Sequence, residues 1–82
     1  MRTPEIDYPC RWTYRVIGRG EAPIRARIAH VVGDRAHTLA PSQTSAAGRY
    51  VSLVLELEVR DASDRDRIFA DLLADPAIVT IL

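Results

Sequence analysis

The chain has 82 residues with a formal net charge of zero; 27% of its residues are charged and 48% are hydrophobic. This composition predicts one globular domain with a thin two-layer core, and it excludes a disordered chain and a membrane-spanning helix. Cys10 is the only cysteine, which excludes an intramolecular disulfide and a thiolate metal cage. With no apolar signal region after Met1, we expect a cytoplasmic protein.

Charge is divided unevenly along the chain. Residues 1–49 hold eight Arg and four acidic residues, net +4, whereas residues 50–82 hold three Arg and seven acidic residues, net −4. A nucleic-acid binder is normally basic overall, so this polarity favours a protein partner or a dimer over nucleic acid. All eleven basic residues are Arg. Codon usage is the favoured explanation, and selection for bidentate anion binding is the alternative.

Residues 1–9 are predicted to be a flexible lead-in, because they combine two prolines with three charged residues. A single domain is predicted to occupy residues 10–82. Its first strand runs from Arg11 to Gly18, where apolar and polar residues alternate, and Gly18 and Gly20 end it. The apolar face of this strand holds Trp12, Tyr14 and Val16.

A helix is predicted from Glu21 to Val32, because apolar residues recur there at helical spacing. They are Ile24, Ile28 and Val31. Gly33 is the expected stop, since glycine readily takes the left-handed conformation found after a helix.

A short strand and a loop are predicted between this helix and Tyr50. His37 to Pro41 is predicted to be a short edge strand, because Pro41 has no N–H to donate to a neighbouring strand. Ser42 to Gly48 has the composition of a turn and is expected to be a mobile hairpin loop.

Tyr50 to Arg60 is the longest uninterrupted alternation in the chain. A helix is excluded, because a period near 3.6 would scatter its aliphatic residues around the whole circumference. The segment therefore predicts a strand in the middle of an antiparallel sheet, apolar on one face. The apolar face holds Val51, Leu53, Leu55, Leu57 and Val59.

The last third of the chain predicts a helix and a strand. Ser63 stands three residues before Asp66, a variant of the capping box that opens a helix. Pro76 ends this helix, and Ala77 to Leu82 forms a short apolar strand. The predicted apolar face of the helix holds Ile68, Phe69, Leu72 and Leu73.

The element order is therefore βαββαβ. Right-handed crossovers place the strands in the order 4-1-3-2, which is the ferredoxin-like α+β sandwich with both helices on one face of the sheet. The opposite face is left open, with apolar spots expected at Val54, Ile78 and Leu82.

Five short segments, in order, resemble the bacterial YbeD-like family of small proteins of unknown function. They are Tyr8-Pro9-Cys10, Tyr14-Arg15-Val16-Ile17-Gly18, Pro41-Ser42, Gly48-Arg49-Tyr50-Val51-Ser52 and Ile78-Val79-Thr80-Ile81-Leu82. The resemblance implies a ferredoxin-like fold similar to the ACT regulatory domains, a regulatory or binding role, and a context in lipoate metabolism. No catalytic residue is established for this family, so none is carried over, and no cofactor is predicted for the chain. The chain departs from the family pattern at Arg15 and Ile17, where Lys and Met are common, and in a longer loop before Gly48.

The open sheet face is the candidate binding surface. Arg11, Thr13 and Arg15 are expected there beside Glu56, Glu58 and Tyr50. Plain cross-strand pairing is the favoured interpretation, and a polar platform for an anionic ligand or partner is the alternative. RNA binding is disfavoured, because such sheets stack bases on two or three central aromatic residues and only Tyr50 is available.

Isolated residues give weaker signals. Arg19 is a candidate for anion binding at the start of the first helix, with an ordinary solvated loop as the favoured interpretation. Cys10 is expected to be a small packed residue, since a nucleophile would need a base such as His30 or His37. His30 is expected to stabilise a helix end, and the two histidines have no recognised metal-binding spacing.

The predicted function is a non-enzymatic regulatory or binding module that senses a small metabolite or binds a partner protein. A weak homodimer through an edge strand or the open face is also expected. The alternative is a small enzyme that acts on an anionic substrate, with Arg19 and Cys10 near one site.

Overall fold

The longest alternating segment forms the strand β3, Val51–Val59, which lies inside the sheet as predicted. The computed structural model describes residues 9–42 and 50–82. The other strands are β1, Cys10–Gly18, β2, His37–Pro41, and β4, Ile78–Ile81. The helices are α1, Glu21–Val32, and α2, Ala62–Leu73.

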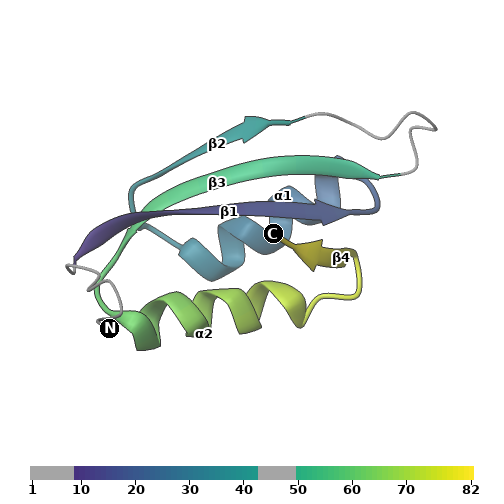
Figure 1. Ribbon diagram of the computed structural model, residues 1–82. Helices are drawn as coiled ribbons and strands as arrows, with labels where there is room; N and C mark the ends of the chain where they lie inside the picture. Colours follow the sequence, from purple (N-terminus) through teal and green to yellow (C-terminus); the bar gives the residue numbers. More distant parts are fainter. Residues whose placement is uncertain (1–8, 43–49) are drawn as a thin grey trace, which may run out of the picture.

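The sheet order is β2-β3-β1-β4 with all neighbours antiparallel, which confirms the predicted order 4-1-3-2 and the ferredoxin-like βαββαβ fold. Figure 1 shows both helices on one face of the sheet. Within the described ranges, neither helix is long and apolar enough to cross a bilayer. Apart from Pro9 and Ser42, the predicted lead-in and the predicted hairpin loop lie outside the described residues.

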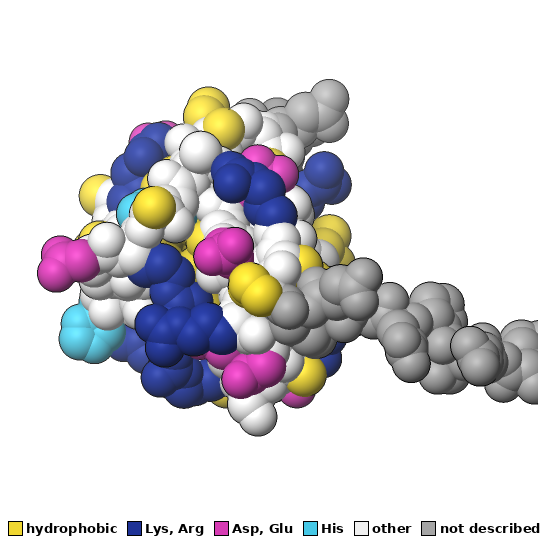
Figure 2. Space-filling model, turned by 90° about the vertical axis from the view of Figure 1, so that its left-hand side faces the viewer, with side chains coloured by type: hydrophobic (Ala, Val, Ile, Leu, Met, Phe, Trp, Pro, Cys, Tyr) yellow, Lys and Arg dark blue, Asp and Glu magenta, His cyan; other side chains and the backbone are white. Residues whose placement is uncertain are grey.

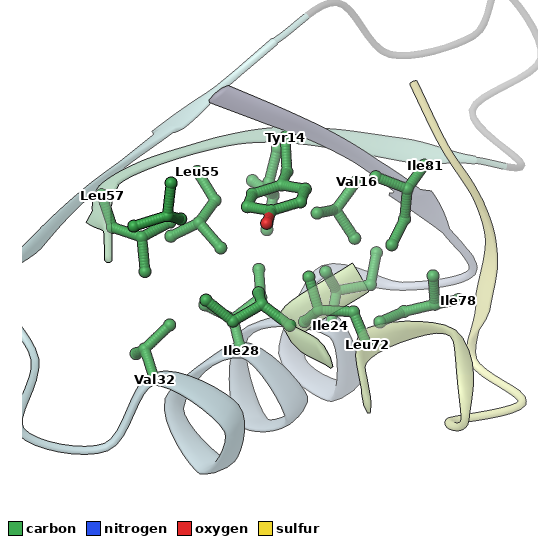
Figure 3. Close-up of a cluster of buried hydrophobic side chains, with 13 residues drawn as sticks. Tyr14, Val16, Ile24, Ile28, Val32, Leu55, Leu57, Leu72, Ile78 and Ile81 are labelled. Carbon is green, nitrogen blue, oxygen red and sulfur yellow. The ribbon is translucent and has the colours of Figure 1, made fainter. Parts of the chain in front are cut away.

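The core lies between the sheet and the two helices. β1 and β3 pair from Cys10 opposite Val59 to Gly18 opposite Val51, so their apolar residues share one face. Figure 3 shows these side chains pointing at those of α1 and α2. Trp12 is only partly buried at its margin. The buried apolar residues are Tyr14, Val16, Ile24, Ile28, Val32, Leu53, Leu55, Leu57, Val59, Ile68, Leu72, Ile78 and Ile81.

Helix α1 has the predicted bounds and the predicted stop. Gly33 has φ 57°, and its N–H donates to the Ala29 carbonyl at 2.9 Å. One residue of the predicted stripe differs: Val32 is buried and Val31 is only partly buried. The reason is that Val32 lies four residues after Ile28, on the same side of the helix.

The predicted capping box at the start of α2 is wrong. Ser63 lies inside the helix, and Asp61 is the residue that caps it, because its carboxylate accepts the Asp64 N–H at 2.7 Å. Asp66 is exposed and pairs with the neighbouring Arg65 at 3.0 Å. The cap therefore comes two residues earlier than the spacing of Ser63 and Asp66 predicted.

Asp64 is a buried carboxylate that joins α2 to the segment between α1 and β2. The Arg35 guanidinium donates to both of its oxygens, at 2.9 and 3.1 Å, and Arg67 donates at 2.9 Å. The Arg60 N–H donates at 3.0 Å. These donors, Arg35 above all, hold the Asp64 pKa well below its usual range although burial opposes them. We call Asp64, Arg35 and Arg67 the Asp64 cluster. Figure 2 shows the molecule from the left-hand side of Figure 1, where basic and acidic side chains are interspersed.

The last strand, β4, packs closely on the end of β1. A Cβ on Gly18 would lie 2.3 Å from the Ala77 carbonyl oxygen, which accepts the Arg19 N–H at 2.9 Å. Ile78 was expected to leave an apolar spot on the open face, and this is wrong: it is 5% exposed and lies in the core. An irregularity of register between Ile17 and Gly18 turns Ile78 inward, opposite Gly18.

Candidate functional site

The open sheet face brings together four of the six predicted site residues. Thr13 lies opposite Glu56 and donates to its carboxylate at 3.2 Å, while an Arg11 nitrogen lies 3.7 Å from the same carboxylate. Thr38 on β2 also donates to Glu56, at 3.4 Å. Arg15 lies further along β1, opposite Val54. Three residues therefore contact the Glu56 carboxylate. These contacts are the cross-strand pairing that the sequence favoured.

Arg15 is one of the charged residues of this face. It is exposed, and it makes no ion pair within residues 9–42 and 50–82. Its backbone exchanges two hydrogen bonds with Leu82, at 3.1 and 2.9 Å. The main chain of Arg15 is thus fixed in the sheet, and its charged side chain is available to a binding partner.

Arg19 and Tyr50 lie elsewhere. The pairing of β1 with β3 ends at Gly18 opposite Val51, and Arg19 and Tyr50 lie just beyond this pair. Arg11 lies at the other end of β1. At about 3.3 Å per residue, Arg11 and Arg19 are roughly 26 Å apart along the strand. The six predicted site residues therefore lie in two separate regions of the surface. The roles of Arg19 and Tyr50 stay predictions.

Cys10 and Arg19 do not share a site. Cys10 is the first residue of β1 and Arg19 follows its last residue, so the strand separates them. Cys10 packs against the core, as expected. His37 contacts the Arg35 carbonyl through Nδ1 at 2.9 Å, and His30 lies exposed in the last turn of α1. The described part of the chain holds no group of three side chains suited to a metal.

A groove between β1 and α2 was missed by the analysis of the sequence. It has a volume of about 290 Å³, and we call it the β1–α2 groove. It is lined by Trp12, Thr13, Tyr14, Arg65, Asp66, Phe69, Ile81 and Leu82. Phe69 is 40% exposed and Leu82 is 73% exposed, so apolar surface is accessible here. The prediction that Phe69 and Leu73 belong to the core face of α2 is wrong, since Leu73 is 39% exposed as well.

The groove exists because β4 is shorter than β1. β4 pairs with Val16 to Gly18, and Leu82 continues the pairing only as far as Arg15. In Figure 1, β4 runs beside only one end of β1, while α2 runs beneath most of that strand. No strand of residues 9–42 and 50–82 therefore lies beside Trp12 and Phe69 on this side.

The polar contacts of the groove hold its walls in place. The Arg65 guanidinium lies 4.9 Å from the centre of the Trp12 ring and also pairs with Asp66. The Tyr14 hydroxyl donates to the Arg65 carbonyl at 2.7 Å, which ties β1 to α2 beneath the groove. Burial, followed by the nearby Asp64 charge, raises the pKa of Tyr14 from 10.0 to about 12.

This hydroxyl makes stability depend on pH under alkaline conditions. Because the pKa is higher in the folded state, the contribution of Tyr14 is present below pH 10 and is lost as the pH rises to about 12. We expect the free energy of unfolding of the wild type to fall by about 2–3 kcal/mol more than that of the Tyr14→Phe variant over this range. Urea unfolding at pH 9 to 12 measures the difference. Tyr50→Phe is the control, and it should lose stability as the wild type does because it retains Tyr14. Parallel curves for wild type and Tyr14→Phe would contradict the assignment.

Comparison with known proteins places this chain among small bacterial proteins. The model of a family described as protein of unknown function (DUF493) matches residues 3–82. An uncharacterised protein of Campylobacter jejuni is 32% identical over 78 residues, which cover 95% of this chain and 90% of that protein. A UPF0250 protein of Shewanella sediminis is 27% identical over 82 residues, covering 94% of this chain and 90% of that protein.

A solved structure has the same fold. The solution structure of the Helicobacter pylori protein HP0495 superposes with a TM-score of 0.83 at 28% identity, covering 99% of this chain and 89% of that one. A second solution structure of HP0495 gives a TM-score of 0.69, with 100% and 95% covered. These matches confirm the resemblance to the YbeD-like family, and the family description assigns no activity.

Proposed function

The chain belongs to the DUF493 family of proteins of unknown function, and from this premise we propose that it is a non-enzymatic module that binds a partner protein at the β1–α2 groove. The observation that carries the proposal is the exposed apolar surface in this groove. Trp12 of β1 and Phe69 of α2 line it, Leu82 lies at its rim after the end of β4, and Arg65 and Asp66 form its polar edge. Accessible apolar surface bordered by polar residues is typical of protein interaction sites.

The distribution of reactive groups supports a binding role over an enzymatic one. Among the described residues, those that line the groove include no Cys, Ser or His. Cys10 and Arg19, the candidates for a reaction on an anionic substrate, lie at opposite ends of β1. A nucleophile and an anion-binding group have to approach the same atoms, so this pair supports no shared active site.

Sensing of a small anionic metabolite, in the manner of an ACT domain and in a lipoate-related context, is the second candidate. It is favoured by Arg15, which has no acidic partner in the described ranges and lies on the same face as Arg11. The weak homodimer through an edge strand or the open face also stays a prediction.

A displayed library of random twelve-residue peptides tests the protein-binding role directly. We expect peptides selected on the wild type to bind the Phe69→Ala variant at least about tenfold more weakly, since an apolar anchor is lost. Leu73→Ala is the matched control, because Leu73 lies on the same helix with the same exposure and does not line the groove. Its affinity should stay within about twofold of the wild type. Failure to select any peptide, or equal losses in both variants, would refute the proposed function.

A further inference from the structure

Building on the proposed function, we propose that the partner supplies an extended segment that alternates apolar and acidic side chains. This segment adds to β1 as an antiparallel strand, in line with β4 and beyond Leu82. The proposal depends on the unpaired edge of β1, on the groove beneath that edge, and on the two arginines that β1 presents on the open face.

The backbone of β1 presents an edge for pairing. Arg15 exchanges both of its main-chain hydrogen bonds with Leu82, so its N–H and C=O point toward the β4 side. In an antiparallel sheet these directions alternate, so Thr13 and Arg11 point their main-chain groups to the same side. No strand of the described residues lies beside them there. Together they present two donors and two acceptors to an added strand.

The groove determines which side chains the added strand needs on its inner face. Residues opposite Trp12 and Tyr14 point toward α2, because opposite residues of paired strands share a face. There they meet the exposed Phe69 and the Trp12 ring that lies under Arg65. Apolar side chains at these alternate positions therefore fill the β1–α2 groove.

The open face determines the other half of the alternation. A residue opposite Thr13 points to the open face, with Arg11 and Arg15 as its diagonal neighbours. Glu56 is already shared by Arg11, Thr13 and Thr38, and Arg15 has no ion pair in the described ranges. An acidic side chain at this position pairs with both arginines, and a basic one is repelled.

A second copy of this chain is a poor occupant of the same edge. In a symmetric antiparallel pair of β1 strands centred on Thr13, Arg11 of each copy lies opposite Arg15 of the other. Like charges directly opposite each other destabilise a sheet. The outer edge of β2 is also poorly suited to pairing, because Pro41 lacks a donor N–H. The charge pattern therefore favours an acidic segment of a different protein.

The test uses the full chain and a seven-residue peptide in which aspartate occupies the second, fourth and sixth positions and valine the others. Binding is followed by NMR, and the amide signals of Arg11 and Thr13 are expected to shift. Backbone N-methylation of the aspartates removes the N–H groups that face β1 and should weaken binding at least about tenfold. N-methylation of the valines is the matched control, because their N–H groups face away, and it should change affinity by less than about twofold.

Charge reversal supplies the second arm. Arg15→Glu is expected to weaken binding of the aspartate peptide by about tenfold or more and to restore binding to a peptide with lysine in place of aspartate. The inference is overturned if the aspartate peptide does not bind, if both N-methylated forms bind equally, or if light scattering shows that the wild type pairs with itself through this edge. Should library peptides still depend on Phe69 in any of these cases, the groove binds a partner in another way and only the strand addition is refuted.

Discussion

Replacing Asp64 with asparagine is expected to lower the free energy of unfolding by about 3 kcal/mol at neutral pH, because it removes the charge that two arginines and a main-chain N–H share. Asp64 is 7% exposed, so the guanidinium of Arg35 loses its partner in a place that water reaches poorly. The remaining exposure of Arg35 keeps the expected loss at the lower end of that for buried pairs. Urea unfolding of the two proteins at pH 7 measures the difference.

The effect of this substitution should depend on pH in a defined direction. The folded state lowers the Asp64 pKa below its ordinary value of 3.8, so the stabilisation is present above about pH 4 and is lost as the pH falls further. The difference in unfolding free energy between wild type and Asp64→Asn should therefore narrow as the pH falls from about 4 to about 2. Asp66→Asn is the control: it removes an exposed carboxylate from the same helix, and we expect a loss below about 1 kcal/mol. Equal losses at both positions would show that the Asp64 cluster is not a structural link.

Replacing Leu55 with alanine is expected to cost about 2–5 kcal/mol, since it leaves a cavity in a fully buried part of the core. Leu55 lies opposite Tyr14 on β1 and Leu39 on β2, so the lost side chain contacts both neighbouring strands. A chain of this length has a total stability of about 4–12 kcal/mol, so the variant should be partly unfolded at ordinary temperatures. Thermal unfolding followed by circular dichroism measures this.

Val54→Ala is the matched control for Leu55→Ala. Val54 is the preceding residue of β3 and lies on the open face, opposite Arg15 and Ala40. Its truncation should cost less than about 1 kcal/mol, because α1 and α2 both lie on the other face of the sheet. If both variants lose the same stability, the two faces of β3 do not differ as the fold requires.

The sheet could be predicted because its signals are local. The alternation of β3 has period two over nine residues, and Gly33 and Pro41 mark the end of α1 and the edge of the sheet. Pairing then follows from chirality rules that depend on element order alone. The open face could also be predicted, since Arg11, Thr13 and Arg15 recur at the same period and Glu56 lies opposite.

The Asp64 cluster and the groove could not be predicted, because both depend on distant segments. Arg35 and Asp64 are 29 residues apart, and nothing near either of them signals the pairing. The exposure of Phe69 follows from the shortness of β4, since a longer strand would cover it. β1 has nine residues and β4 has four, so β4 can cover only part of β1. Only the register shows which half of β1 is left uncovered.

Gly18 connects these observations with how the chain can be altered in the laboratory. The Ala77 carbonyl occupies the space that any side chain at this position would need. The chain entering β4 can therefore approach the end of β1 only because residue 18 has no side chain. A mutant library that diversifies β1 to redesign the groove should therefore keep this codon constant and concentrate its variation at the opposite end of the strand.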